Sequence, residues 1–388
     1  MMPLLMVMPG IIPTTSPITT PTAVAARLDG STTWARPWTT SAFTATRSAR
    51  SVTELRYARR RPEGPGTGLD AMTDVFIDGQ AGTTGLRIRE RLAAREDVNL
   101  IEIPEESRKD PEVRRQYLNE ADVVILCLPD DAAREAIRLI SSNHVRVLDA
   151  STAHRVADGW VYGLPELDAG QRERIRGAAR VSNPGCYPTG FVLLTRPLVD
   201  AGIVPGDARL SCHAVSGYSG GGRRLIERYE TRSAECPHAL WNVRPYGLDL
   251  DHKHLPEMTR YSRIDRAPVF SPMVGHFAQG MLTMIPLHTD TLGEGAAAET
   301  VHACLNARYR DESCVEVLPL GDENVLDAGF LDPLAANGTN RIDLFVYGND
   351  DQVLLVARLD NLGKGASGAA VQNLNIMTGA GELSGLAL

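Results

Sequence analysis

The sequence predicts an α/β protein with two domains, in which a parallel-sheet domain precedes an α+β domain with a mixed or antiparallel sheet. In residues 72–150, short apolar runs alternate with helical patterns, which is typical of a parallel sheet covered by helices. After residue 190, strand-like segments follow one another without regular helices between them, which is typical of a mixed or antiparallel sheet. The 388 residues are enough for two such domains.

Residues 1–71 differ in composition from the rest of the chain. They contain eight Arg, no Lys and four acidic residues, a net charge of +4, and no apolar period persists in them. We predict that translation starts at Met72. A segment rich in Arg, Ser and Thr with few acids also resembles an organelle transit peptide, and a disordered extension is the third alternative.

The charge and the cysteines of the remaining 317 residues indicate which partners to expect. These residues contain 32 basic and 44 acidic side chains, a net charge of −12, which argues against nucleic acids and membrane surfaces as partners. The apolar run at the amino terminus is interrupted by prolines and is too short to span a bilayer. The six cysteines lie far apart without a C-x-x-C pair, so we expect reduced thiols, no zinc site and a cytoplasmic protein.

A dinucleotide-binding turn is predicted at the start of the first domain. The apolar run 75–77 leads into the sequence GQAGTTG at 79–85 and then into a helical pattern. A strand, a glycine-rich turn and a helix in this order bring backbone N–H groups close to a pyrophosphate. In the helix we expect Leu86, Ile88 and Leu92 to be buried. The turn residues expected to contact the cofactor are Gly79, Gly82, Thr83, Thr84 and Gly85.

Three further strands are expected at 98–103, 122–128 and 145–149. The second of these is apolar throughout, as buried parallel strands are, and Asp130 follows where a helix should begin.

The residues after the 98–103 strand bear on the choice of cofactor. Glu102, Glu105 or Glu106 could bind the ribose hydroxyls of NAD, whereas the hydroxyl of Ser107 and the guanidinium of Arg108 suit the 2′-phosphate of NADP. We favour NADP.

The sequence NPGCYPTG at 183–190 contains a candidate nucleophile. Cys186 lies where a tight turn leads into an apolar helical segment, and the N-terminus of a helix stabilises a thiolate. A thiolate is the form of cysteine that attacks an acyl carbon. The other five cysteines lack such surroundings, and we expect them to be structural.

A histidine is the expected proton partner of this thiol. The sequence DHKHLPE at 251–257 offers two, His252 and His254, whose pKa lies near the working pH of an enzyme. In an extended segment they would point to the same side, but no third ligand follows at metal-site spacing, so we expect no metal. The pattern by itself does not choose between the two.

The sequence DASTAHR at 149–155 follows the fourth strand. It lies at the carboxyl edge of the sheet, where open α/β sheets bind ligands, and the hydroxyls of Ser151 and Thr152 with the guanidinium of Arg155 could hold a phosphate or a carboxylate. The alternative is a helix cap followed by exposed polar residues.

In the second domain, strands are expected at 209–215, 280–287, 314–318, 341–348 and 352–359. A last helix at 364–377 has small residues on one face, which allow close packing on the first domain.

Seven segments taken together resemble the N-acetyl-gamma-glutamyl-phosphate reductases, in particular their shorter bacterial type. Residues 1–71 have no counterpart in this family, and DASTAHR departs from the DLSADFR-like form of the longer branch while keeping the Ser and the Arg, which leaves the role of His154 open. The segments are GQAGTTG (79–85), DASTAHR (149–155), YGLPE (162–166), NPGCYPTG (183–190), SGYSGGGR (216–223), HKHLPE (252–257) and DNLGKGASGAAVQNLN (360–375).

The resemblance implies an NADP-dependent reductase of arginine biosynthesis that works like the semialdehyde dehydrogenases. Cys186 would attack the acyl phosphate of N-acetyl-L-glutamyl 5-phosphate and form a thioester, which hydride then reduces to the 5-semialdehyde. His254 would be the acid/base, Ser151 and Arg155 would hold the phosphate, and Asn361 would contact the cofactor. Alternatives are an aspartate-semialdehyde dehydrogenase, a related reductase of a lysine pathway, or a dinucleotide-binding redox sensor.

The resemblance also implies a domain division and an assembly. The dinucleotide-binding domain would comprise residues 72–186 and be completed by residues 360–388. The catalytic and oligomerisation domain would comprise residues 187–359, and the protein would be a homodimer or homotetramer.

Overall fold

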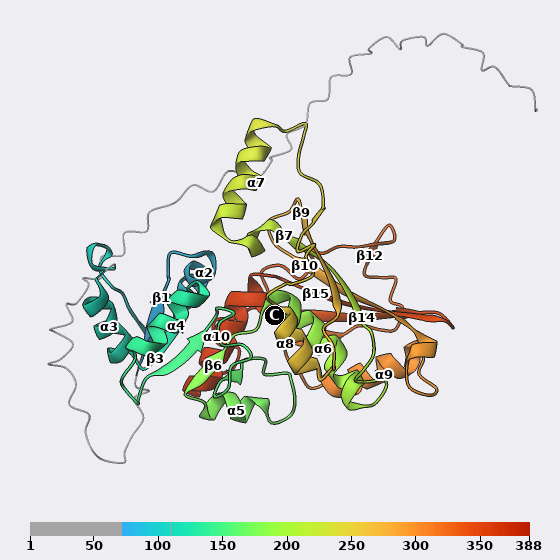
Figure 1. The fold of residues 1–388 in the computed structure, drawn as a ribbon, viewed down its shortest axis with the longest axis horizontal. Helices are drawn as coiled ribbons and strands as arrows, with labels where there is room; N and C mark the ends of the chain where they lie inside the picture. Colours follow the sequence, from blue (N-terminus) through green and yellow to red (C-terminus); the bar gives the residue numbers. More distant parts are fainter. Residues whose placement is uncertain (1–71, 109) are drawn as a thin grey trace, which may run out of the picture. The chain divides into compact units, whose positions relative to one another are not determined.

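The computed structural model describes residues 72–108 and 110–388 (Figure 1). Our predictions for residues 1–71 lie outside the described residues. In the part of the chain that the structure describes, no helix is long and apolar enough to cross a membrane.

A six-stranded parallel sheet forms the first part of the fold, in the order β2-β1-β3-β4-β6-β5. The four predicted strands are present, and two short strands, β5 and β6, extend the sheet. The chain moves from β1 to β2 on one side and then to β3 on the other, so the carboxyl end of β1 is the reversal point at which such sheets bind ligands. The strands are β1 (Thr73–Asp78), β2 (Val98–Ile101), β3 (Val123–Leu126), β4 (Arg146–Asp149), β5 (Val161–Tyr162) and β6 (Arg180–Ser182).

The helices that accompany this sheet are α2 (Thr83–Leu92), α3 (Pro111–Glu120), α4 (Asp130–Leu139) and α5 (Gln171–Gly177), with the short turn η1 (Glu105–Ser107) after β2. In α2 the buried residues are Gly85, Ile88 and Leu92. Our prediction for Leu86 was wrong, because this side chain is 44% exposed. The spacing 85, 88, 92 follows the helical period and residue 86 does not, so Gly85 takes the buried position.

A seven-stranded mixed sheet forms the second part, in the order β11-β14-β15-β10-β7-β9-β8. The pairs β7–β9 and β11–β14 are parallel and the others are antiparallel. All five predicted strands are present: β7 (Ser211–Gly217), β10 (Met281–His288), β11 (Val315–Val317), β14 (Ile342–Gly348) and β15 (Gln352–Leu359). We did not predict β8 (Arg244–Pro245) or β9 (Val269–Gly275), and Pro272 interrupts the apolar pattern of β9.

The helices α6 (Cys186–Asp200), α8 (Leu255–Ser262) and α9 (Ala298–Tyr309) belong to this second part. α6 packs on β10 and β15, α9 packs on β14, and α8 packs on α6, so the amino terminus of α6 lies inside the fold. Figure 1 shows α7 (Arg223–Glu235) standing apart from these helices. The remaining elements are η2 (Tyr218–Gly221), η3 (Thr289–Thr291), β12 (Leu326–Asp327) and β13 (Phe330–Leu331).

The C-terminal helix returns to the first sheet. A π-helical turn, η4 (Gly363–Ser367), precedes α10 (Gly368–Thr378), which packs against α2, α5 and β4 (Figure 1). Apolar residues of α10 such as Leu374 share one buried cluster with Val75 of β1. This packing supports our proposal that residues 360–388 complete the domain formed by residues 72–186, with residues 187–359 as the second domain.

Candidate active site

The turn before α6 brings polar side chains close to Cys186. Helix α6 begins at Cys186, with Gly185 as its N-cap. A Cβ atom on Gly185 would lie 2.5 Å from Nη1 of Arg155 and 2.8 Å from both Nε2 of His254 and Oε1 of Glu257. A side chain at this position would therefore displace all three groups, and a glycine is needed for them to converge beside the thiol.

The carboxylate of Glu257 holds this arrangement together. It is buried, and its Oε1 accepts a hydrogen bond from Arg155 at 2.6 Å. Its Oε2 accepts hydrogen bonds from the hydroxyl of Tyr162 at 2.9 Å and from the backbone N–H of Gly185 at 3.1 Å. Our sequence reasoning gave Glu257 and Tyr162 no role, although both belong to motifs of the resemblance, HKHLPE and YGLPE.

The thiol of Cys186 has opposing influences on its pKa. Burial raises the pKa, whereas the nearby Arg155 guanidinium and the backbone N–H of Tyr187 lower it. Burial is the larger effect, so the pKa lies above the ordinary value of a cysteine. The helix N-terminus predicted from the sequence is present, but it does not by itself yield a thiolate, and a base is needed.

His254 is placed to be that base. It is buried at the start of α8, and burial together with the charge of Arg155 holds its pKa well below 6.5. The imidazole is therefore neutral near pH 7 and able to accept a proton. Its Nε2 also lies 4.0 Å from the Glu257 carboxylate, beside the turn that precedes α6.

His252 lies next to His254, with 4.8 Å between the ring centres. The backbone N–H of Leu255 donates to the carbonyl of His252 at 2.9 Å, so the two residues lie in a turn, and Nδ1 of His252 accepts the backbone N–H of His254 at 3.2 Å. Burial lowers the pKa of His252 to about 4. This geometry favours His254 over His252 as the proton partner of the thiol, because only His254 approaches Gly185.

Ser151 and Arg155 point to different partners. The Ser151 hydroxyl donates to the buried carboxylate of Asp149 at 2.7 Å, and Asp149 also contacts Nδ1 of His154 at 2.6 Å. The ring of His154 is stacked on Trp160. Ser151 therefore helps to shape the turn after β4, whereas Arg155 reaches Cys186; a direct role of Ser151 in phosphate binding stays a prediction.

A cavity of about 650 Å³ joins the thiol to the glycine-rich turn. Its lining includes six of the predicted site residues, namely Thr83, Thr84, Arg155, Cys186, His254 and Asn361. The other six, Gly79, Gly82, Gly85, Ser107, Arg108 and Ser151, are not part of this lining.

The three glycines of the turn shape its backbone. Gly79 has φ = +93°, and a Cβ there would overlap the carbonyl oxygen of Cys127 at the end of β3. A Cβ on Gly85 would lie 2.5 Å from the carbonyl oxygen of Gly79. Gly82 is the N-cap of α2, whose first turn contains no acidic residue. The turn therefore leaves the N–H groups of a helix N-terminus open to an anion, as the pyrophosphate of a dinucleotide requires.

Asn361 supports the loop that faces this turn. Its Oδ1 accepts the backbone N–H of Gly280 at 2.9 Å, and its Nδ2 donates to the Ser219 hydroxyl at 3.0 Å. These bonds anchor η2, the glycine-rich segment that lines the cavity. The predicted contact between Asn361 and the cofactor stays a prediction.

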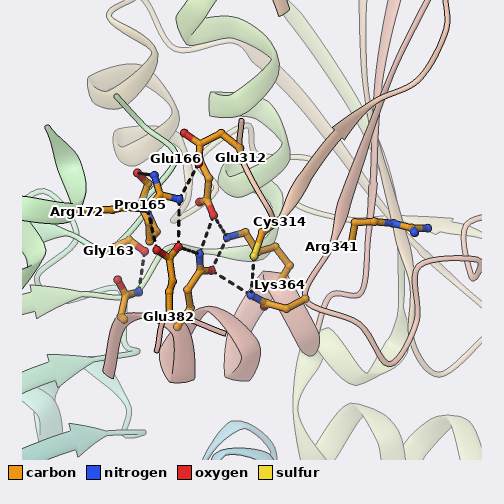
Figure 2. A network of polar contacts seen from close by, with 12 residues as sticks. Gly163, Pro165, Glu166, Arg172, Glu312, Cys314, Arg341, Lys364 and Glu382 are labelled. Atoms are coloured by element: carbon orange, nitrogen blue, oxygen red, sulfur yellow. Dashed lines mark hydrogen bonds and ion pairs between the residues drawn. The ribbon is translucent and has the colours of Figure 1, made fainter. Parts of the chain in front are cut away.

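A second polar network, which we did not predict, lies behind Cys186. Lys364 of η4 is fully buried, and its Nζ donates to Glu166 at 2.8 Å and to Gln372 at 2.7 Å (Figure 2). Burial raises the pKa of Glu166, but the charge and hydrogen bond of Lys364, together with Gln372 and Arg172, bring it below its ordinary value. A Cβ on the next residue, Gly365, would lie 2.7 Å from the Cβ of Cys186. The network thus holds η4 directly against the thiol.

Comparisons with known proteins show to which family the two domains and the fold belong. Residues 74–178 match the family described as semialdehyde dehydrogenase, NAD binding domain, and residues 186–361 match semialdehyde dehydrogenase, dimerisation domain. Among solved structures, aspartate semialdehyde dehydrogenase II from Vibrio cholerae has a TM-score of 0.61 at 17% identity, over 79% of this chain and 98% of that chain. The structural likeness shows the shared fold.

Curated relatives are much more similar in sequence. N-acetyl-gamma-glutamyl-phosphate reductase 2 from Nostoc sp. is 52% identical over 317 residues, which cover 80% of this chain and 98% of the relative. N-acetyl-gamma-glutamyl-phosphate reductase from Rhizobium etli is 50% identical over 310 residues, 78% of this chain and 98% of the relative. At this identity and coverage, the chain belongs to the N-acetyl-gamma-glutamyl-phosphate reductase family of oxidoreductases, with an NAD(P)-binding domain of the semialdehyde dehydrogenase type.

Proposed function

We propose that the chain reduces N-acetyl-L-glutamyl 5-phosphate with NADPH to N-acetyl-L-glutamate 5-semialdehyde and phosphate, as a step of arginine biosynthesis. The observation that carries the proposal is the convergence of Cys186, His254 and Arg155 around Gly185, in a cavity that extends to Thr83 on the dinucleotide turn. A nucleophile, a neutral base and a cation beside a dinucleotide site are what reduction through a thioester requires.

In the first half of the reaction, His254 takes the thiol proton of Cys186. The sulfur forms a bond to the acyl carbon, and the bond from that carbon to the phosphate oxygen breaks. Arg155 stabilises the departing phosphate: its Nε–H has no hydrogen-bond partner among the described residues, so the guanidinium keeps a donor in addition to those used by Glu257 and Ala150. His254 returns its proton to the phosphate.

In the second half, the thioester on Cys186 is reduced and the product is released. NADPH, when bound at the glycine-rich turn, supplies the hydride. Hydride adds to the acyl carbon, and a proton that His254 takes up from solvent adds to its oxygen, which gives a thiohemiacetal in which Cys186 is still bonded to the substrate carbon. His254 then removes the hydroxyl proton and passes it to the sulfur as the carbon–sulfur bond breaks, so that the thiol is regenerated and the semialdehyde is released. Splitting the reduction in this way suits the chemistry, because a thioester accepts hydride far more readily than a carboxylate does.

The preference for NADPH over NADH is supported by the charges after β2. The carboxylate of Glu102, a candidate partner for the ribose hydroxyls of NAD, is paired with Arg89 at 2.6 Å. Arg108 lies 3.8 Å from Glu105, a long contact that leaves its guanidinium available. An available guanidinium at Arg108 and an acid at Glu102 that is already paired favour a 2′-phosphate. Arg89 was not among our predicted cofactor residues.

The assembly and location follow from the same proposal. We propose a cytoplasmic homodimer or homotetramer, supported by the match of residues 186–361 to a dimerisation domain. The partners of the enzyme are then small molecules and further copies of the chain.

A single assay tests the proposed function. N-acetyl-L-glutamate 5-semialdehyde should support reduction of NADP that depends on phosphate, and the Cys186→Ser variant should lose this activity. Aspartate semialdehyde is the control substrate, because the fold is shared with aspartate semialdehyde dehydrogenases. Equal or faster turnover of aspartate semialdehyde would contradict the proposal, and so would full activity of the Cys186→Ser variant.

A further inference from the structure

Two arginines that line the cavity have no acidic partner among the residues that the structure describes. Arg244 of β8 and Arg228 of α7 both contact the ring of Trp241, with their guanidinium carbons 4.3 Å and 5.3 Å from the ring centre. No carboxylate within ion-pair distance of either guanidinium is found in residues 72–108 and 110–388. Arg155, by contrast, uses one of its donors on Glu257. Two guanidinium groups that contact one indole concentrate positive charge on this part of the cavity lining, and that charge attracts an anion.

The path of the chain places Arg244 near the reacting thiol. Strand β8 pairs with β9, and Tyr246 continues the ladder by donating its backbone N–H to Pro272 at 3.0 Å. Arg244, Pro245 and Tyr246 all line the cavity. The hydroxyl of Tyr246 lies 3.2 Å from that of Tyr187, the residue after Cys186. Arg244 is therefore about 7 Å along the strand from a residue that contacts the catalytic turn.

The substrate has a group that needs such a partner. In N-acetyl-L-glutamyl 5-phosphate, four carbon–carbon bonds separate the reacting carbonyl carbon from the α-carboxylate carbon, a span of about 5 Å. When the acyl phosphate lies beside Cys186 and Arg155, the α-carboxylate is therefore about 5 Å from the reacting carbon. Guanidinium groups bind carboxylates through two parallel hydrogen bonds, and stacking on an indole holds the guanidinium plane in place.

We propose that Arg244 and Arg228, held on Trp241, bind the α-carboxylate of the acyl substrate and so select substrates that carry it. This inference rests on the proposed function, because it concerns the same cavity and the same substrate. Lys253 also lines the cavity.

The test compares two aldehydes that differ only in the carboxylate. N-acetyl-L-glutamate 5-semialdehyde carries it, and 4-acetamidobutanal has hydrogen in its place. The Arg244→Met variant should lower kcat/KM for the first aldehyde by about 10- to 100-fold, mainly through KM, because hydrogen bonds to charged groups contribute that much to binding. For 4-acetamidobutanal, kcat/KM of the variant should stay within about twofold of the unchanged enzyme. The Arg228→Met variant should behave in the same way.

The matched control is Arg224→Met, an exposed arginine of the same helix as Arg228 that does not line this cavity. It should leave kcat/KM for both aldehydes unchanged. Equal losses on both aldehydes in Arg244→Met, or no loss on either, would overturn the subsite. An enzyme that turns over neither aldehyde before substitution would instead overturn the proposed function, so the two failures are distinguishable.

Discussion

The carboxylate of Glu257 lies 2.6 Å from a guanidinium nitrogen of Arg155, and both groups are buried beside Cys186. The pair joins α8 to the turn after β4, two segments about a hundred residues apart in the chain. The buried guanidinium needs a compensating charge, and a buried carboxylate supplies it. The pair therefore fixes where the cation lies relative to the thiol, and in our proposal this cation stabilises the departing phosphate.

Replacing Glu257 with Gln tests this positioning role. The amide keeps the size of the side chain and can still accept the N–H of Gly185, but it no longer neutralises Arg155. We expect kcat to fall by about 10-fold or more, because a small displacement of a group that stabilises charge is costly. Binding of NADPH, measured by fluorescence, should be unchanged.

The control for this variant is Glu312→Gln. Glu312 also forms ion pairs with two arginines, Arg172 at 2.6 Å and Arg308 at 2.8 Å, but it does not line the cavity. Its substitution should affect stability and leave kcat nearly unchanged. Equal losses of kcat in the two variants would contradict a positioning role for Glu257.

The His254→Asn variant tests the acid/base assignment. We expect turnover to fall by about 100-fold or more, with binding of NADP retained, because proton transfer to a positioned base contributes that much to a rate. The His252→Asn variant is the matched comparison and should lose much less activity. Near-normal turnover in His254→Asn would move the role to His252.

The low pKa of His254 also predicts how stability depends on pH. The unfolded chain takes up a proton at this histidine below about pH 6.5, whereas the folded chain resists doing so because burial and Arg155 hold the pKa well below 6.5. The free energy of unfolding should therefore decrease as the pH falls below about 6.5, with a slope of at most about 1.4 kcal/mol per pH unit for this group. Urea unfolding between pH 7.5 and 5.5 measures this slope.

In His254→Asn the same slope should become smaller. It should not vanish, because His252 also has a lowered pKa, about 4, and contributes in the same direction. A slope identical to that of the unsubstituted protein would show that His254 is protonated in the folded state and would argue against its role as a neutral base.

Cofactor preference is tested by Arg108→Ala. If this guanidinium binds the 2′-phosphate, the KM for NADPH should rise by about 10-fold and the KM for NADH should not change. Arg115→Ala on α3, where the arginine lies 3.7 Å from Glu112, is the control and should change neither value. An unchanged ratio of the two KM values in Arg108→Ala would refute our interpretation of this loop.

The buried pair of Lys364 and Glu166 makes a prediction for stability. Lys364→Met leaves a buried carboxylate without its cation and should lower the free energy of unfolding by about 3–5 kcal/mol, and adding Glu166→Leu should recover much of this loss. Because the pKa of Glu166 is lowered in the folded state, the pair stabilises the protein at neutral pH. That contribution should disappear as the pH falls from about 4.5 through the lowered value, and the double variant should not show it. Urea unfolding at pH 7 and near pH 4 measures both effects, and a double variant no more stable than Lys364→Met would contradict them.

Local patterns were sufficient to predict much of the fold and part of the site. The strand, glycine-rich turn and helix from residue 73 to residue 92 follow from apolar runs and from glycines whose backbone other residues cannot adopt. Cys186 was recognised because it follows a tight turn and begins a helix. Strand β9 was missed because Pro272 interrupts its apolar pattern. In the structure β9, including this proline, lies in the sheet between β7 and β8.

Most of the strands, the family and the residue types proposed for the chemistry could be predicted from the sequence alone, because these depend on short-range backbone preferences and on motifs read along the chain. Only the tertiary structure decided that Glu257 joins Arg155 to the catalytic turn, that Lys364 lies buried behind the thiol, and that burial raises the pKa of Cys186 and lowers that of His254. Desolvation and Coulomb interactions depend on distances between residues that the fold brings together from far apart in the chain.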